Sequence, residues 1–195
     1  LDPLLLVVAA MGVSMTGVML HEKPAFPDAA ASVYPLLTCF LPMSMFMMMM
    51  NSTYGVVPGI ALITMAFAIA YAGDGAAYFG GRAMGKHKLC PNVSPKKTVE
   101  GAVGGVIGGA VLVLIAALIM NSTLKLGLPL WAAVVLGAVG AVLGEIGDLS
   151  FSIIKRQTGI KDYGHIFPGH GGVLDRFDSV IFVAPFAEFL FRIVF

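Results

Sequence analysis

The chain has 195 residues, of which 58% are hydrophobic and only 12% are charged. A soluble domain usually carries about 25% charged residues, so this composition excludes a protein with a polar surface all round and indicates a membrane protein. The formal net charge of +1 excludes a nucleic-acid-binding protein that works by bulk electrostatic attraction. The two cysteines are too few for a disulfide framework or a multi-cysteine metal site.

Six apolar segments follow one another, each close to the length of about 20 residues that a helix needs to cross a bilayer. They cover residues 4–20, 30–50, 56–78, 102–120, 128–149 and 177–194. Together they fill well over half of the chain and leave no room for a separate soluble domain. We therefore predict an all-α fold, a polytopic transmembrane bundle of about six helices, with residues 1–195 forming a single membrane domain.

The fourth predicted helix carries small residues at three- and four-residue spacing, which favour close packing against a neighbouring helix. These are Gly101, Gly104, Gly105, Gly108 and Gly109. The basic segment Ser94-Pro95-Lys96-Lys97-Thr98 directly precedes it. Thr98 is placed to cap the helix, whose free N–H groups could hold a phosphate. The alternative for Lys86, Lys88 and Lys96 is that they reach the lipid headgroups as ordinary surface residues.

The basic residues are concentrated in two connecting segments. The segment before the fourth predicted helix holds Arg82, Lys86, Lys88, Lys96 and Lys97. The segment between the fifth and sixth holds Lys155, Arg156, Lys161 and Arg176. The positive-inside rule places both segments in the cytoplasm, and the two crossings between them agree with this placement. We therefore predict an integral membrane protein with a polar site on the cytoplasmic face.

Five acidic residues are predicted at helix ends on this side: Asp74, Glu145, Asp148, Asp175 and Asp178. Acids in membrane helices are costly and tend to be functional. Asp175 and Asp178 share a helix face, as do Glu145 and Asp148, so a hairpin of the last two helices would gather up to four carboxylates. Such a cluster needs a proton or a cation, and its oxygen ligands suit Mg²⁺. The alternative is that Asp175 and Asp178 merely favour the positive end of their helix.

Basic residues surround these acids in the segment that joins the last two predicted helices. They are Lys155, Arg156, Lys161, His170 and Arg176. Interleaved charges of both signs indicate that a metal ion and an anion share one site. Gly171 and Gly172 follow His170, and glycine lets the backbone approach a ligand closely.

The residues 152–178 read SIIKRQTGIKDYGHIFPGHGGVLDRFD and resemble the signature of the phosphatidate cytidylyltransferases, also called CDP-diglyceride synthases. Gly147-Asp148-Leu149-Ser150, Gly85-Lys86-His87-Lys88-Leu89 and the segment 94–101 resemble the same family. The resemblance covers the chain from about residue 72 to its end, which makes residues 72–195 the predicted catalytic part and residues 1–71 a group of N-terminal helices. Two departures stand out. Phe151 occupies a position where many members carry Glu, and members are generally longer at the N-terminus, which predicts that leading helices are missing here.

The resemblance implies transfer of CMP from CTP to phosphatidate, giving CDP-diacylglycerol and pyrophosphate at the cytoplasmic face of a bacterial inner membrane. CTP, phosphatidate and membrane lipid are the expected partners, Mg²⁺ the expected cofactor, and a second cation and a homodimer are left open. We assign Asp148 and Asp175 as metal ligands with Asp178 as a third acid, and count Lys155 and Arg176 with them as catalytic. The predicted substrate-binding residues are Ser94, Lys97, Thr98, Arg156, Lys161, His170, Gly171 and Gly172. A phosphate monoester is largely a dianion at neutral pH, so we expect no protein general base and assign His170 to phosphate binding.

Three alternatives belong to other classes. A CDP-alcohol phosphotransferase motif would begin like Asp74-Gly75-Ala76-Ala77, but it then needs an Arg close by and two later aspartates at four-residue spacing, whereas this chain continues with Tyr78 and has no acid before Glu100. An ion-coupled transporter would place its acids near the middle of the membrane. A lipid-binding scaffold without catalysis would explain the basic segments but not three converging aspartates.

Overall fold

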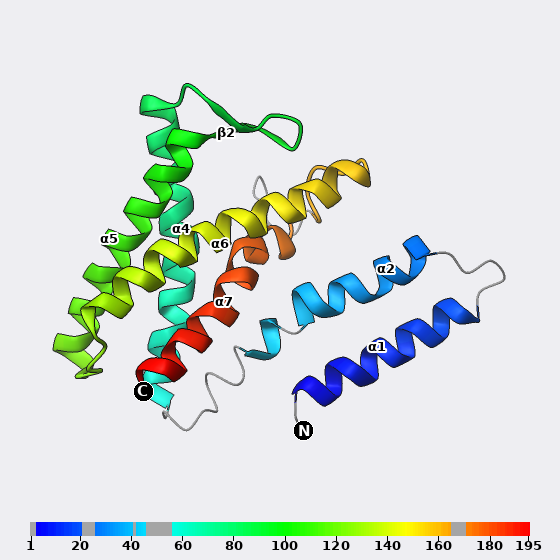
Figure 1. Cartoon of the computed structure of the whole chain (residues 1–195), viewed down its shortest axis with the longest axis horizontal. Coiled ribbons are helices and arrows are strands. Elements are labelled where there is room, and N and C mark those ends of the chain that lie inside the picture. Colours follow the sequence, from blue (N-terminus) through cyan, green and yellow to red (C-terminus); the bar gives the residue numbers. More distant parts are fainter. Residues whose placement is uncertain (1–2, 21–25, 41, 46–55, 165–170) are drawn as a thin grey trace.

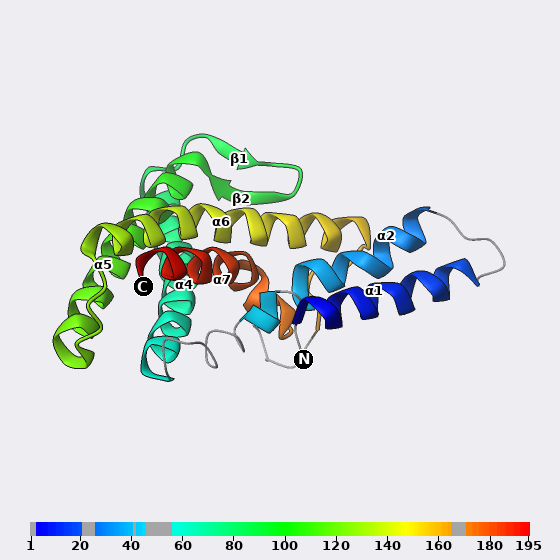
Figure 2. The same cartoon turned by 60° about the horizontal axis from the view of Figure 1, so that its bottom comes forward.

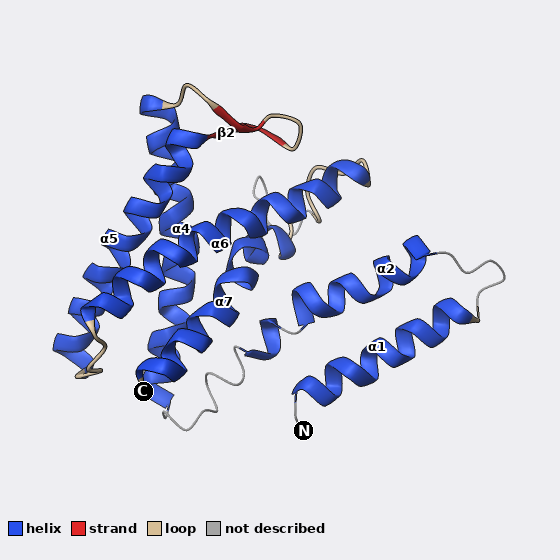
Figure 3. Cartoon of the chain, viewed as in Figure 1, coloured by secondary structure: helices blue, strands red, loops and turns tan. Residues whose placement is uncertain are grey.

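The computed structural model of the chain describes residues 3–20, 26–40, 42–45, 56–164 and 171–195. Helices dominate these residues (Figure 3), which confirms the predicted all-α fold. In chain order the elements are α1 (Pro3–Met19), α2 (Phe26–Pro35), the π-helical turn η1 (Leu36–Phe40), α4 (Val56–Met84), β1 (Lys88–Cys90), β2 (Ser94–Thr98), α5 (Val99–Leu124), α6 (Leu130–Gln157) and α7 (Leu174–Val194). The sequence did not predict the two short strands.

The helices α4, α5, α6 and α7 pack on one another, and α1 and α2 lie side by side next to this bundle (Figures 1 and 2). Three helices of the described part are long and apolar enough to cross a membrane, namely Pro58–Met84, Val99–Leu124 and Leu130–Gln157. They agree with three of the six predicted crossings. The predicted crossing over residues 30–50 includes residues that lie outside the described part.

The core lies where α4, α5, α6 and α7 meet. Met65 and Ile69 of α4, Val113 of α5 and Val183 of α7 are completely buried there. Large apolar side chains also cover the outside of the bundle; Ile107, for example, is 60% exposed. A helix that is apolar on all sides is typical of a membrane environment, where the outward side chains meet lipid.

The predicted close packing of glycines occurs between α4 and α5. A Cβ atom on Gly101 would lie 3.2 Å from the Cα of Gly81 and 2.7 Å from the carbonyl oxygen of Ala77. A Cβ on Gly105 would lie 3.1 Å from the carbonyl oxygen of Gly73. Only residues without side chains let the two backbones approach this closely. This contact fixes the start of α5, and with it β2, against α4.

Two helices extend beyond their predicted ends, and this corrects the predicted position of three acids. The helix α4 runs to Met84 instead of residue 78, and α6 runs to Gln157 instead of residue 149. Asp74, Glu145 and Asp148 therefore lie inside helices and not at their ends. The helix dipole favours basic side chains in the last turn of a helix. The point at which basic residues appear in the sequence is therefore the final turn of each helix and not the start of a loop.

The same extension moves three basic residues out of the predicted connecting segments. Arg82 lies in the last turn of α4, and Lys155 and Arg156 lie in the last turn of α6. The helix α7 begins at Leu174, so Arg176 lies in its first turn. Asp175 and Asp178 open α7 as predicted.

The strands β1 and β2 form an antiparallel hairpin that projects over α6 (Figure 2). The carboxylate of Glu100, in the first turn of α5, accepts the backbone N–H groups of Lys86 and His87 and contacts the His87 ring at 2.6 Å. At the other end of the hairpin, Arg156 Nε donates to the carbonyl oxygen of Val93 at 3.3 Å. The hairpin is thus held at both ends and carries Lys97 toward α6.

Candidate active site

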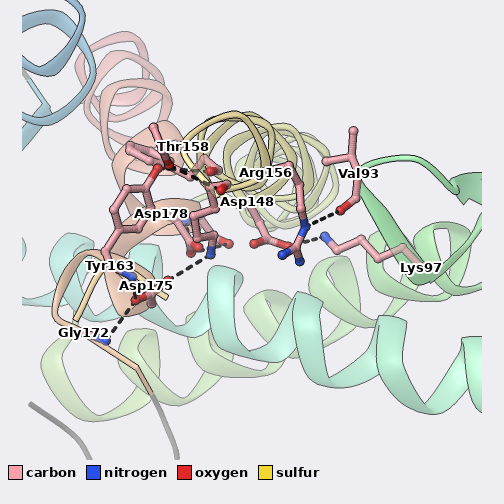
Figure 4. A network of polar contacts seen from close by, with 12 residues as sticks. Val93, Lys97, Asp148, Arg156, Thr158, Tyr163, Gly172, Asp175 and Asp178 are labelled. Atoms are coloured by element: carbon pink, nitrogen blue, oxygen red, sulfur yellow. Dashed lines mark hydrogen bonds and ion pairs between the residues drawn. The ribbon is translucent and has the colours of Figure 1, made fainter. Parts of the chain in front are cut away.

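Lys97 is the cationic centre of a cluster of acids. Its ammonium group lies 2.6 Å from Asp148 Oδ2 and 2.9 Å from Glu145 Oε1 (Figure 4). The Lys97 side chain is 21% exposed. Burial alone would lower its pKa, but the attraction of the Asp148 and Glu145 carboxylates outweighs this and raises the pKa of Lys97 above its ordinary value. The lysine therefore stays charged throughout the physiological range.

A polar pocket of about 310 Å³ opens beside this lysine, between α4, β2, α5 and α6. It is lined by three acidic and three basic side chains: Asp74, Glu145, Asp148, Arg82, Lys96 and Lys97. The pocket can therefore receive both an anion and a cation. Thr98 forms part of its wall and caps α5 as predicted, because its Oγ1 accepts the N–H of Gly101 at 3.1 Å.

Asp148 also faces a second carboxyl group across the α6–α7 contact. Asp178 is only 7% exposed, and its Oδ1 accepts the backbone N–H of Ser179 at 2.8 Å. The carboxyl groups of Asp148 on α6 and Asp178 on α7 lie near each other (Figure 4). Two carboxyl groups this close share a proton or a cation. This pair is the convergence that the sequence predicted for the fifth and sixth helices.

Asp175 holds the segment between α6 and α7. Its Oδ1 lies 2.9 Å from Lys155 Nζ, and its Oδ2 accepts the backbone N–H groups of Tyr163 at 2.7 Å and Gly172 at 2.9 Å. Asp175 precedes the apolar part of α7. Burial would raise the pKa of this carboxyl, but the Lys155 hydrogen bond and the two backbone donors hold it below its ordinary value.

Lys155 and Tyr163 connect this segment to the core. Lys155 is 8% exposed, and its ammonium group lies 5.4 Å from the centroid of the Tyr163 ring. The Tyr163 hydroxyl donates to the carbonyl oxygen of Phe151 at 3.0 Å. Phe151 is itself buried and packs edge-on against the rings of Tyr163 and Phe182. Phe151 therefore has a packing role.

A family model described as the cytidylyltransferase family matches residues 2–194. The chain belongs to the cytidylyltransferase family. It is 46% identical to a phosphatidate cytidylyltransferase of Staphylococcus saprophyticus over 132 residues. These aligned residues make up 68% of this chain and 49% of that protein. Proteins of the same name from Bacillus subtilis and Haemophilus influenzae are 42% and 40% identical over 68% and 70% of this chain and 48% and 47% of their own lengths. The chain thus spans about half the length of these relatives, and the resemblance stated from the sequence is confirmed.

The structure brings the predicted site residues of this cytidylyltransferase-family chain into two adjoining groups. Lys97 and Asp148 line the polar pocket, and the buried Asp178 lies beside Asp148. Lys155, Asp175 and Gly172 meet at the start of α7. Arg156 binds the hairpin instead of the pocket. Lys161 lies exposed after α6, and Ser94 begins β2.

His170 and Arg176 are two further residues that the sequence predicts to bind phosphate. His170 lies outside the described residues. Arg176 has a buried Nε atom for which the described part of the chain supplies no hydrogen-bond partner, while its carbonyl oxygen accepts the Tyr71 hydroxyl at 3.3 Å.

From the sequence we assigned no site role to four residues that the structure places in or beside the site: Asp74, Arg82, Glu145 and Tyr163. Asp74 reaches the polar pocket from α4, and Tyr163 supports Lys155 and Asp175. Asp74 was visible as a lone acid in an apolar helix, which is itself a functional signal. Tyr163 carried no such signal, because its role depends on contacts with α6 and α7.

The donor set fits the predicted Mg²⁺ at the Asp148–Asp178 pair. Mg²⁺ keeps several waters and usually takes one or two carboxylates together with substrate phosphates. Within the described ranges, no three His, Cys, Asp or Glu side chains gather into a metal-binding group. The carboxylate of Asp175, predicted as a ligand, is occupied by Lys155 and two backbone donors. We retain the metal as a proposal with two carboxylates at its centre.

Gly171 should tolerate no side chain. Its φ of +79° is one that L residues rarely adopt, and a Cβ would lie 2.9 Å from Asp175 Oδ2. We expect Gly171→Ala to destabilise the protein, with about 1–3 kcal/mol from the backbone alone, and to expose residues 158–164 to protease. Gly159→Ala is the matched control, because Gly159 has a φ of +72° with no atom near the added Cβ. Equal losses of thermal stability in detergent for the two variants would contradict the contact with Asp175.

Proposed function

We propose that this member of the cytidylyltransferase family transfers CMP from CTP to phosphatidate, giving CDP-diacylglycerol and pyrophosphate. The observation that carries the proposal is the polar pocket in which Lys97 faces Asp148 and Glu145, directly beside the Asp148–Asp178 pair. Three basic side chains suit the phosphates of two anionic substrates, and the carboxyl pair suits a cation. The similarity to phosphatidate cytidylyltransferases of three bacteria supports the same activity.

The chemistry needs charge neutralisation more than proton removal. A phosphate oxygen of phosphatidate attacks the α-phosphorus of CTP, and the bond from that phosphorus to the bridging oxygen breaks, so that pyrophosphate leaves with its electron pair. Much of the phosphatidate is already a dianion at neutral pH, because a phosphate monoester has a second pKa near 6. No protein base is therefore required, and His170 is kept as a phosphate-binding residue.

Each group of residues has its own proposed task. Lys97, Lys96 and Arg82 attract the substrate phosphates and offset the repulsion between two anions. Asp148 and Asp178 would hold Mg²⁺, which when bound would neutralise charge on the triphosphate.

The Lys155–Asp175 contact fixes the segment before α7 and sets the position of Gly171 and Gly172. Asp175 would reach a cation only by giving up one of its present hydrogen bonds. The remaining predicted substrate contacts stay proposals: Ser94, Thr98, Arg156, Lys161 and Arg176.

The activity test uses the protein in detergent with Mg²⁺, CTP and phosphatidate. We expect pyrophosphate release that depends on phosphatidate, with CDP-diacylglycerol identified in the lipid extract by mass spectrometry. CDP-alcohol phosphotransferase activity, the alternative from the sequence, would instead consume CDP-diacylglycerol and release CMP. Pyrophosphate release without a cytidylylated lipid would contradict the proposed acceptor.

We propose that the site faces the cytoplasm of a bacterial inner membrane, and Cys90 in the hairpin reports on this. In sealed right-side-out vesicles, a membrane-impermeant thiol reagent should modify Cys90 only after the membrane is opened. Cys90→Ser identifies the labelled residue, since Cys39 is the other cysteine. Labelling of Cys90 in intact vesicles would reverse the orientation.

A further inference from the structure

An apolar groove of about 440 Å³ lies between α4, α5 and α6, beneath the hairpin. Ile69 of α4, Val103 and Ile107 of α5 and Ile146 of α6 line it, and Leu89 of β1 lies at its end. Val103 is 54% exposed and Ile146 is 47% exposed, so the groove is open along the outer face of the bundle. This is the face that meets lipid if α5 and α6 cross the membrane.

The groove continues into the polar pocket. Asp74, Ala77, Ala102 and Glu145 line both. One end of the combined cavity is therefore apolar and open toward lipid. The other end carries three basic side chains, Arg82, Lys96 and Lys97, together with the three acids that line the polar pocket. The closely packed glycines Gly73 and Gly105 also line the groove.

We propose that this groove takes one acyl chain of an anionic phospholipid whose phosphate lies in the polar pocket at Lys97. The inference rests on the proposed function and adds to it the path of the lipid substrate. Charge complementarity selects this occupant, because an apolar channel that ends at basic residues matches a fatty acyl chain joined to a phosphate. Neither a second copy of the chain nor a free nucleotide has both features.

In a bilayer the groove should position the bound lipid more than it strengthens lipid binding. An acyl chain that moves from lipid into the groove exchanges one apolar environment for another, so burial supplies little driving force, as for helix association in membranes. Binding strength should come from the phosphate, and the groove should aim that phosphate at the pocket. Filling the groove should therefore reduce turnover of long-chain lipid while leaving a short-chain analogue unaffected.

The test compares two valines of α5 with similar exposure. Val103 lines the groove, whereas Val111, which is 50% exposed, does not. The probe is a long-chain phosphatidate with a diazirine near the end of one acyl chain, in phosphatidylcholine vesicles and without CTP. We expect cross-links on the groove residues of α4, α5 and α6 that fall at least about fivefold in Val103→Trp and stay unchanged in Val111→Trp. Ile107→Trp and Ile119→Trp form a second pair, in case Val103→Trp fails to fold, because both are exposed and only Ile107 lines the groove.

The outcomes separate this inference from the proposed function. Cross-links in the groove without any cytidylylated lipid on adding CTP would support the groove and overturn the activity. Cytidylylation with cross-links elsewhere, or equal effects of the paired tryptophans, would overturn the groove and leave the activity standing. Equal cross-linking by a phosphatidylcholine probe would overturn the requirement for an anionic phosphate. Protection of the groove by contact with a second copy of the chain, seen as protein–protein cross-links in place of lipid ones, would also overturn the inference.

Discussion

Asp148→Asn should abolish CTP-dependent turnover, with a loss of roughly 10³-fold or more if Asp148 helps to hold the cation. Asp148 forms an ion pair with Lys97 and lies beside Asp178, so it joins the polar pocket to the carboxyl pair. The amide keeps the size of the side chain but removes its charge. The measurement is kcat at saturating CTP and Mg²⁺, together with the thermal midpoint in detergent to confirm folding.

Glu145→Gln is the matched control for this variant. Glu145 lies one turn earlier on α6 and also pairs with Lys97, at 2.9 Å. The structure places Asp148, and not Glu145, beside Asp178, so Glu145→Gln should keep a measurable fraction of turnover. If both variants lost activity equally, the ion pair with Lys97 would explain the effect and the assignment of Asp148 to the cation would fail.

Lys97→Met should reduce kcat by about 10²–10³-fold, the range expected when one preorganised charge at a reacting phosphate is removed. It should also change cation binding, because Asp148 and Glu145 lose the ammonium group that now neutralises them. We expect tighter binding of Mn²⁺, used as a spectroscopic substitute for Mg²⁺, in Lys97→Met than in wild type. The first measurement is steady-state kinetics and the second is the electron paramagnetic resonance signal of free Mn²⁺.

Lys88→Met serves as the control on the same hairpin. The Lys88 ammonium donates to the carbonyl oxygen of Pro95 at 2.7 Å, away from the acid cluster. This variant should leave both kcat and Mn²⁺ binding close to wild type. A Lys97→Met protein with wild-type kcat would remove Lys97 from the proposed site, whatever its effect on Mn²⁺.

The fold was predictable from the sequence where length and hydropathy alone decide it. Apolar segments of sufficient length predicted α4, α5 and α6. The glycine spacing predicted that α5 packs closely against a neighbouring helix, and the structure shows that this neighbour is α4. The ends of α4 and α6 were predicted too early because a basic residue such as Arg82 was read as a loop residue. The hairpin was not predicted, since Pro95 and two lysines are unfavourable in a strand. The hairpin is held by Glu100, which lies just after β2, and by Arg156, which lies 63 residues from its partner Val93.

The sequence predicted most residues of the candidate site but not the contacts between them. The sequence placed Asp148 and Asp178 together through the expected pairing of the last two helices, and the structure shows that contact. It did not show that Lys97, about fifty residues earlier in the chain, would lie between Asp148 and Glu145. Nor did it show that Asp175 would bind backbone N–H groups of its own segment. Both depend on tertiary packing that no local pattern encodes.

We propose that this polar pocket moves CMP onto a lipid phosphate. A decisive experiment supplies the purified protein with Mg²⁺, phosphatidate and CTP that carries a radiolabel on either its α-phosphate or its γ-phosphate. We expect the α-label to enter the lipid fraction and the γ-label to leave as pyrophosphate, and we expect Asp148→Asn to stop both. Transfer of the γ-label to lipid, or no label in lipid with a folded wild-type protein, would contradict this proposal.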